Sequence, residues 1–310
     1  MSDGFNTPSD DDNRDLTSNV GATATMAAAA RAAASRLHPA LVSDPFAELL
    51  VREVGVDFFI RLAACEDIDF GPGLARLIDV VAARTRHFDE YLTEASESGA
   101  QQLVILASGL DSRPHRLRLA PSTSIYEIDR AGVISYKTTA LARLGIGSLT
   151  NHHVAVSVDL RADWPTSLLC AGFDRTQPTA WLAEGLFGYL PPDAQDRLID
   201  DITSLSTAGS RFAADVVPNL SPPEQDNFRR AIRDLLTDWR AQGLETDMST
   251  DMVYLEERSD LADYAATRGW TTESLTASDL LAANGLRPTD DDDYRAPFAM
   301  AHYVSATRTQ

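Results

Sequence analysis

Hydrophobic and polar positions divide the chain into a helical first third and a later part in which strands and helices alternate. The alanine-rich stretch over residues 20–37 has strong helix propensity, and its small side chains suit close packing against another helix. Asp44 and Pro45 provide an acidic cap and a proline start for a second helix. Residues 74–95 then place apolar side chains at helical spacing. The pattern therefore predicts helices up to about residue 100.

A buried sheet begins at residue 101, where QQLVILA is a short continuous apolar run. Four further runs have the length and composition of strands, and helix-like stretches separate them: 124–129, 153–160, 178–187 and 211–217. This alternation implies right-handed crossovers and an α/β, Rossmann-like, doubly wound sheet.

The last hundred residues predict a helical insertion followed by the end of the sheet. Ser221 and Glu224 have the spacing of a capping box ahead of an amphipathic helix. From Trp270 onward the pattern reads strand, helix, strand. We therefore expect a disordered acidic tail over 1–16, a helical cover over 17–100, and a Rossmann-like domain over 101–310 with a helical insertion at about 219–265.

Composition narrows the classes of partner. The 310 residues carry 27 Lys and Arg against 46 Asp and Glu, a net charge of −19, which disfavours nucleic acid and acidic membrane surfaces. The first twenty residues are acidic where a signal peptide would be basic, and no run is long enough for a transmembrane helix, so we expect a cytoplasmic protein. Cys65 and Cys170 lie too far apart for a CxxC site and are expected to be ordinary buried thiols.

Ligands of open α/β sheets bind beyond the carboxyl ends of the strands, so the residues after each predicted strand are the candidates for a site. The segment 107–113 follows the first strand and contains the single glycine Gly109. Dinucleotide folds use three glycines to approach a pyrophosphate, and this loop lacks two of them. A nucleoside ligand without phosphates and a simple tight turn both remain open.

An acid ends the second strand at the spacing typical of ribose recognition. Asp129 lies twenty residues after Gly109, and a carboxylate accepts hydrogen bonds from both ribose hydroxyls. Glu127 points to the same strand face and is the second candidate. The alternative is that these acids are solvated or cap a helix.

Two later strand ends add to the candidate site. Asp159 and Leu160 stand where an acceptor for an adenine amine and an apolar contact for its ring would lie. Glu184 lies inside the apolar run WLAEGLFGYL, where a carboxylate is costly unless it is paired or faces a ligand. A structural ion pair with an arginine is the alternative for Glu184.

Other chemistries have weaker support. His152 and His153 point to opposite faces of a strand and have no third ligand at usable spacing, so no metal site is predicted. The run Asp290–Asp293 lacks the spacing of a calcium loop. Ser108 and Ser112 do not form the GxSxG motif of a hydrolase nucleophile.

Five blocks in order along residues 83–193 carry a family resemblance: ARTRHFD, QLVILASGLDSR, YEIDRAGVISYK, VDLRADW and AEGLFGYLPPD. The series resembles the leucine carboxyl methyltransferase-like family, in particular its actinobacterial and mycobacterial branch of S-adenosylmethionine-dependent methyltransferases. The resemblance implies a class I methyltransferase fold and S-adenosyl-L-methionine as cofactor.

At the methionine end of the cofactor, the resemblance assigns three roles. Arg84 matches the arginine that pairs with the methionine carboxylate, and Glu184 matches the acid near the ammonium group. Tyr189 matches a tyrosine close to the methyl-transfer site and is the catalytic candidate.

Gly109 matches the loop that lies under the methionine part. At the nucleoside end, Asp129 matches the acid that binds the ribose, and Asp159 with Leu160 matches the contact to the adenine. Ala107 begins Ala-Ser-Gly where the family usually has Gly-Ala-Gly, so we expect a slightly less open loop.

The resemblance further implies O-methylation of a carboxylate on a small or peptide-like acceptor. An anionic acceptor needs local positive charge, and Arg113 and the arginines of 229–240 are the candidates to supply it. The alternatives are an NAD(P)-dependent oxidoreductase of Rossmann type and a non-catalytic nucleoside-binding module of the same fold.

Overall fold

The computed structural model describes residues 19–150, 152–246, 248, 253–288 and 297–309. The predicted tail over 1–16 and the run Asp290–Asp293 lie outside these residues. Within the described ranges, no helix is long and apolar enough to cross a membrane. The expectation of two buried thiols was wrong, because Cys65 and Cys170 end helices at the surface, where Cys65 is half-buried and Cys170 is exposed.

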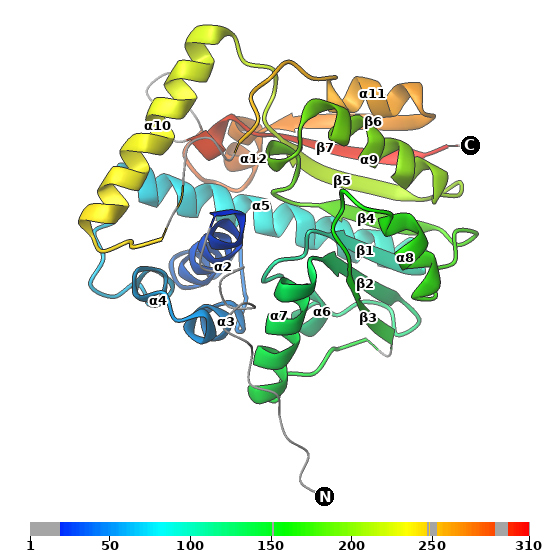
Figure 1. The fold of residues 1–310 in the computed structure, drawn as a ribbon, viewed down its shortest axis with the longest axis horizontal. Coiled ribbons are helices and arrows are strands. Elements are labelled where there is room, and N and C mark those ends of the chain that lie inside the picture. Colours follow the sequence, from blue (N-terminus) through cyan, green and yellow to red (C-terminus); the bar gives the residue numbers. More distant parts are fainter. Residues whose placement is uncertain (1–18, 151, 247, 249–252, 289–296, 310) are drawn as a thin grey trace, which may run out of the picture.

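Helices come first and strands alternate with helices afterwards, as the sequence pattern predicts (Figure 1). The elements are α2 (Asn19–Leu37), α3 (Ala47–Val54), α4 (Asp57–Ala64), α5 (Pro72–Glu97), β1 (Gln102–Leu106), α6 (Arg113–Arg116), β2 (Ser124–Asp129), α7 (Ala131–Arg143), β3 (His152–Ser157), α8 (Trp164–Cys170), β4 (Thr179–Ala183), the 3₁₀ turn η1 (Phe187–Tyr189), α9 (Pro192–Ser204), β5 (Arg211–Val216), α10 (Pro222–Ala241), α11 (Leu261–Thr267), β6 (Trp270–Thr276), α12 (Ala277–Ala283), η4 (Pro297–Met300) and β7 (His302–Arg308).

The strands form one seven-stranded sheet in the order β3-β2-β1-β4-β5-β7-β6. Strands β1 to β5 are parallel, and β7 runs antiparallel to both β5 and β6. The chain builds outward from β1 to β3 and then returns to β4 on the other side of β1. This reversal is the switch point at which open α/β sheets bind ligands. The predicted Rossmann-like, doubly wound α/β fold is confirmed.

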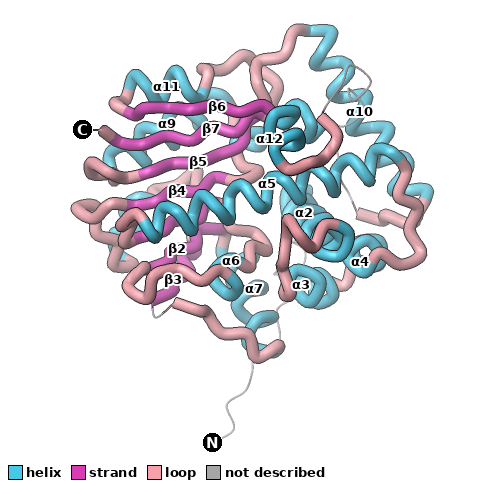
Figure 2. Tube along the Cα trace, turned by 180° about the vertical axis from the view of Figure 1, so that it is seen from behind, coloured by secondary structure: helices cyan, strands magenta, loops and turns pink. Residues whose placement is uncertain are grey.

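Helices cover both faces of the sheet, which explains why β1 is buried at every position. Leu103 and Ile105 pack on the face that carries α5, while Val104 and Leu106 pack on the opposite face with Trp164 of α8. Figure 2 shows α5 and α12 across the first face, and α8, α9 and α11 lie on the other face in Figure 1. The alternation of strand side chains thus supplies two hydrophobic layers.

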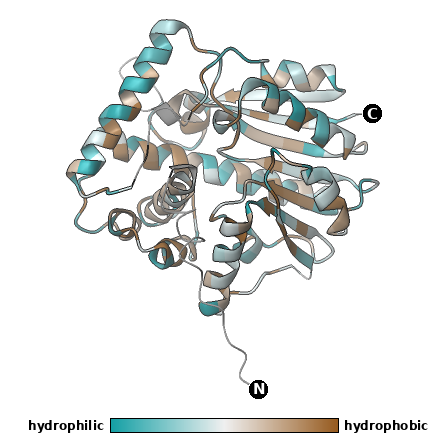
Figure 3. Ribbon diagram, viewed as in Figure 1, coloured by the Kyte–Doolittle hydropathy of each residue, from teal (hydrophilic) through white to brown (hydrophobic). Residues whose placement is uncertain are grey.

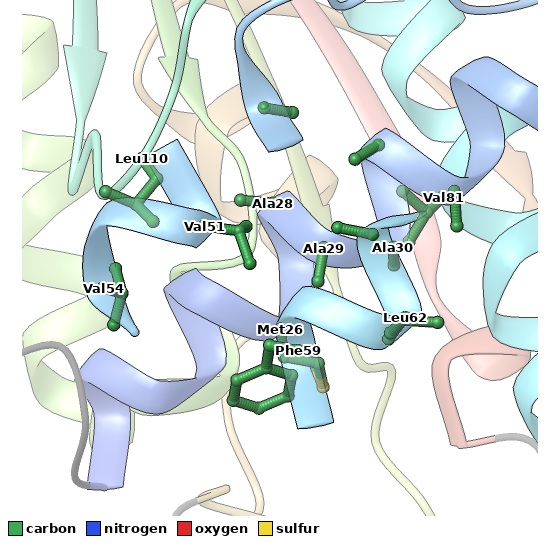
Figure 4. Packing of buried hydrophobic residues seen from close by; sticks show 14 of the residues in the cluster. Met26, Ala28, Ala29, Ala30, Val51, Val54, Phe59, Leu62, Val81 and Leu110 are labelled. Atoms are coloured by element: carbon green, nitrogen blue, oxygen red, sulfur yellow. The ribbon is translucent and has the colours of Figure 1, made fainter. Parts of the chain in front are cut away.

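The helical cover is built around α2, whose small side chains let α3, α4 and α5 approach closely. Ala28, Ala29 and Ala30 are fully buried and lie against residues of these neighbours (Figure 4). Helix α10 alternates hydrophilic and hydrophobic positions (Figure 3) and turns Leu235 and Trp239 toward the same core. The cover and part of the insertion therefore share one hydrophobic core.

Two predicted strands are shorter than their apolar runs. Strand β4 ends at Ala183 because Gly185 adopts a φ of +64° and turns the chain into η1. Glu184 consequently lies just after the strand, not within it. Strand β3 ends at Ser157, so Asp159 and Leu160 belong to the following loop.

The two helix starts predicted from capping residues are present, but one helix begins two residues later than expected. The capping box of α10 is confirmed, since the Ser221 backbone N–H donates to Glu224 Oε2 at 2.7 Å. Helix α3 begins at Ala47, two residues after Pro45, and the Asp44 carboxylate accepts the Ala47 N–H at 3.0 Å.

Asp44 also links the cover to the sheet. Its fully buried carboxylate pairs with Arg31 of α2 at 2.6 Å, accepts the Ser112 hydroxyl at 2.6 Å and lies 3.6 Å from Arg116. Burial alone would raise the pKa of Asp44, but the charges of Arg31 and Arg116 outweigh it and hold the pKa below its ordinary value. Folding therefore gains stability from the ionised form.

We predict that Asp44→Asn lowers the free energy of unfolding by about 3–5 kcal/mol, because it leaves the buried charge of Arg31 uncompensated. Urea unfolding at pH 7 measures this loss. The wild-type advantage is present above the unfolded pKa of about 4 and should shrink as the pH falls through the lower folded pKa.

The matched control is Asp57→Asn, whose side chain is 82% exposed and pairs with Arg61 one helical turn away. An exposed pair of this kind contributes at most about 1 kcal/mol. Equal losses in the two variants, at all pH values, would contradict the role of Asp44.

Candidate functional site

A cavity of about 420 Å³ opens at the carboxyl ends of the parallel strands, beneath α2 and α5. The loops after β1, β2, β3, β4 and β5 all contribute to its wall. The predicted site residues that line it are Arg84, Ala107, Gly109, Asp129, Asp159, Leu160, Glu184 and Tyr189. The topology thus brings all eight together, although they span more than a hundred positions of the chain.

The loop after β1 approaches α2 closely. Gly109 has a φ of +46°, and a Cβ there would lie 3.0 Å from the Cβ of Ala24. This close approach requires glycine at position 109 of the loop and a small residue at position 24 of α2. Ala107 has a φ of +50°, a left-handed conformation that costs a non-glycine residue about 1–3 kcal/mol. The Ala-Ser-Gly loop consequently follows a path on which glycine would be unstrained at position 107.

Asp129 is held at the end of β2 by two backbone donors. The Gly109 N–H donates to its Oδ2 at 2.7 Å and the Arg130 N–H to its Oδ1 at 2.7 Å. Burial raises the pKa of Asp129, and these two hydrogen bonds oppose the increase. Each oxygen keeps a second lone pair, so the carboxylate can still accept hydrogen bonds from a ligand in the cavity.

Glu127, the second candidate for the ribose, does not line the cavity. Its carboxylate is 1% exposed and is bound on both oxygens, by Lys137 at 2.6 Å and by His153 at 2.7 Å. Lys137 also donates to Ser108 Oγ at 3.1 Å and thereby supports the loop after β1. Glu127 therefore faces Lys137, which reaches back from α7 ten residues later in the chain, and not the cavity.

The loop after β3 forms the outer wall. Asp159 pairs with Arg161 at 2.6 Å, and the hydrogen bond from Arg161 lowers the pKa of Asp159. Leu160 is partly buried against the core of that sheet face. The two side chains offer the cavity one ionised acceptor and one apolar contact.

A buried ion network lies under the cavity next to β4. Glu184 Oε1 is 2.9 Å from Arg84 Nε, and Glu184 Oε2 is 2.7 Å from Arg113 Nη1. Burial would raise the pKa of Glu184, but the charges of Arg113 and Arg84 outweigh it and lower the pKa. Both sequence interpretations of Glu184 therefore apply, since it forms structural ion pairs and faces the cavity.

Asp215 is a second acid that lines the cavity and contacts Arg84, and it was not among the residues predicted from the sequence. It lies in the apolar strand β5, accepts the Gly185 N–H at 2.6 Å and contacts Arg84 Nη1 at 3.3 Å. Burial raises its pKa. The sequence did carry a signal for Asp215, because a carboxylate within an apolar strand is unfavourable unless it is paired or faces a ligand.

Contrary to expectation, Arg113 does not supply positive charge to the cavity. Its side chain is 2% exposed and pairs with Asp89 at 2.7 Å, Asp111 at 2.5 Å and Glu184 at 2.7 Å. No arginine of 229–240, all within the described ranges, lines the cavity. The basic residues that do line it are Arg31, Arg84, Arg130 and Arg161.

Tyr189 lies in η1, where it meets the start of α2. Burial raises the pKa of its hydroxyl, and a hydrogen bond with Thr23 opposes the increase. The phenol is therefore protonated at neutral pH and acts as a hydrogen-bond donor or acceptor without charge.

The part of the cavity away from the strand ends is apolar. Leu77, Val80 and Val81 of α5 form one side, and Phe228 of α10 with Val253 forms another. Among the described lining residues there is no histidine. The cavity thus joins a polar half at the sheet to an apolar half under the helices.

A histidine cluster outside the cavity corrects a further expectation. The sequence offers no third ligand for His153 at usable spacing, yet the fold places His115 and Glu127 beside it, with potential ligand atoms within 4.8 Å of one another. These residues come from α6, β2 and β3: the pairing of β2 with β3 brings Glu127 and His153 close together, and the position of α6 adds His115. His152 is not part of the cluster.

Comparisons with known proteins agree with this architecture. A sequence profile of the leucine carboxyl methyltransferase family matches residues 24–203. A Mycobacterium avium protein named "Putative S-adenosyl-L-methionine-dependent methyltransferase" is 50% identical over 296 residues, which cover 92% of this chain and 94% of the relative. A Mycolicibacterium gilvum protein of the same name is 48% identical over 96% of this chain and 99% of its own length.

Among solved structures, a DUF574 family protein from Streptomyces avermitilis superposes with a TM-score of 0.53 at 15% identity. The match covers 85% of this chain and 96% of the other. At this identity the likeness concerns the fold.

Proposed function

The chain belongs to the leucine carboxyl methyltransferase family and is an S-adenosylmethionine-dependent methyltransferase, and from this premise we propose that it methylates a carboxylate oxygen of a small or peptide-like acid. One observation carries the proposal: the cavity joins strand-end acids to an apolar compartment without a histidine among the described residues that line it. The family assignment sets aside the nicotinamide-dependent oxidoreductase.

The residues of the cavity fit the cofactor chemically. We assign Asp129 to the ribose hydroxyls and Asp159 with Leu160 to the adenine. The strained turn at Ala107 and the bare backbone of Gly109 let the chain pass close under the ligand. A loop with one glycine lacks the phosphate cradle of dinucleotide folds, which suits a nucleoside without phosphates.

At the other end of the cofactor, we assign Glu184 to the ammonium group and Arg84 to the carboxylate of the methionine part. Arg84 is oriented for this role by Glu184 and by Asp215, which hold its guanidinium from two sides. When bound, S-adenosylmethionine would supply a methyl group on a sulfonium centre, an electrophile for a carboxylate oxygen, with S-adenosylhomocysteine as the leaving group.

A carboxylate acceptor needs little from the protein beyond alignment. Its reference pKa of about 4 means that it is already ionised at neutral pH and requires no general base. Correct alignment alone can lower the barrier by about 7–11 kcal/mol. Tyr189, protonated and beside Arg84 in the cavity wall, is proposed to donate a hydrogen bond that orients the acceptor.

Local charge compensates for the acidic surface of the protein. Four arginines, Arg31, Arg84, Arg130 and Arg161, line the cavity and offset the carboxylates that share its wall. The apolar walls of α5 and α10 then hold the rest of the acceptor. This arrangement favours an acid whose body is less polar than its reacting end.

We predict that Asp129→Ala binds S-adenosylhomocysteine at least tenfold more weakly, because charge-assisted hydrogen bonds to the ribose contribute about 1.5–3 kcal/mol. Calorimetric titration measures the affinity. Asp193→Ala, which removes an exposed carboxylate from α9, is the control and should bind as the wild type does. Unchanged affinity in a folded Asp129→Ala protein would refute the ribose assignment.

We further predict that Arg84→Lys weakens cofactor binding several-fold, because lysine keeps the charge but loses the planar, two-pronged contact with a carboxylate. The matched control on the same helix is Arg86→Lys, an exposed residue paired with Glu90. If both variants retain wild-type affinity, Arg84 does not bind the methionine carboxylate.

The acceptor chemistry is tested by product stability. The enzyme is incubated with methyl-labelled cofactor and a library of carboxylic acids, amines and phenols, and the products are treated with mild base. We expect the label to be released as methanol, as from a methyl ester, and less labelled product from Asp129→Ala when the cofactor concentration is limiting. Base-stable label as the main product would reject carboxyl transfer and leave the methyltransferase assignment intact.

A further inference from the structure

A cluster of potential metal ligands lies at the β3 edge of the sheet, outside the cavity. Glu127 of β2 and His153 of β3 are on paired strands, and His115 comes from α6. One ring nitrogen of each histidine and one carboxylate oxygen of Glu127 lie within 4.8 Å of one another. None of the three residues lines the cavity.

His115 carries an unused nitrogen in a buried position. The residue is 5% exposed, and its Nδ1 lies 3.1 Å from the carbonyl oxygen of Gly147. Because a carbonyl can only accept, Nδ1 carries the proton and Nε2 carries a free lone pair. Nε2 is buried without a hydrogen-bond partner, which is unfavourable for a polar atom. Metal-binding histidines are typically oriented in this way, with the other nitrogen donating to a carbonyl.

Glu127 and His153 complete the set. Glu127 Oε2 lies 2.7 Å from His153 Nε2, and the two histidine rings pack edge to face with centroids 5.4 Å apart. Lys137 binds the other oxygen of Glu127 at 2.6 Å and so keeps the carboxylate ionised and oriented. The His153 side chain is 17% exposed, which leaves a path from solvent.

We propose that His115, His153 and Glu127 form a binding site for a divalent transition metal of the Zn²⁺ class. Two imidazole nitrogens and one carboxylate oxygen are the ligands that Zn²⁺ prefers, with a fourth position left for water. Binding requires His153 to move its proton from Nε2 to Nδ1, so that Nε2 exchanges its hydrogen bond to Glu127 for a bond to the metal. This rearrangement involves no net change in protonation when His153 is neutral.

The neighbouring His152 cannot serve as a ligand of this site and therefore provides a control. His152 is adjacent in sequence, but its ring points to the other face of β3 and packs against Tyr126 with centroids 5.9 Å apart. His152→Gln is therefore a matched control that removes one imidazole from the same strand and leaves the three ligands in place.

Bound metal is first removed from the protein with a chelator, and the protein is then titrated with Zn²⁺ in competition with a chromophoric chelator. We expect one equivalent to bind to the wild type and to His152→Gln. In His115→Gln and in His153→Gln the affinity should fall at least tenfold. Binding of S-adenosylhomocysteine, tested without metal, shows that each variant is folded.

A second measurement does not depend on variants. Co²⁺ bound to the wild-type protein at this site should give the intense visible absorption of a four-coordinate complex, and Zn²⁺ should displace it. Absence of a one-equivalent site, wild-type Zn²⁺ affinity in folded His115→Gln or His153→Gln, or an equal loss in His152→Gln would each overturn the proposal.

Discussion

The buried guanidinium of Arg113 fixes the arrangement of charges on which the cavity depends. It joins three carboxylates that come from distant parts of the chain: Asp89 of α5, Asp111 of the loop after β1 and Glu184 after β4. Without Arg113, Asp111 would lose its ion-pair partner, while Asp89 would keep only Arg116 and Glu184 only Arg84. The position of Glu184, and through it that of Arg84, is therefore set by charge balance as well as by the backbone.

The same network connects the helical cover to the sheet. Asp89 also binds Arg116 at 2.5 Å, and Arg116 lies beside Asp44, the partner of Arg31 on α2. Buried ion pairs of this kind tolerate little change in geometry, because their desolvation is offset only by well-placed partners. Helix α2, which covers the loop after β1, is thus held by the charge pairing of Arg31 and by alanine packing along its length.

Patterns confined to single segments predicted the fold well. Strand β2 has the bounds expected from SIYEID, and the acids at strand ends gathered at one cavity because parallel strands place their carboxyl ends on the same edge. The misses are pairings between distant segments. The burial of Arg113 by acids up to 71 positions away, and of Glu127 by Lys137, depends on how helices cross the sheet, which local periodicity does not encode. Asp215 could have been found, since it interrupts an apolar strand as Glu184 interrupts an apolar run.

Lys137, which supports the loop after β1, is the only lysine in the chain, and its side chain is 2% exposed. The folded surface therefore presents its positive charge through arginine, which does not lose its proton in any physiological range, and through histidine. Amine-directed reagents meet no lysine on the native surface and gain access to this one only when α7 separates from the sheet. Acylation of a single side chain would therefore report the opening of the structure, with no background from other lysines.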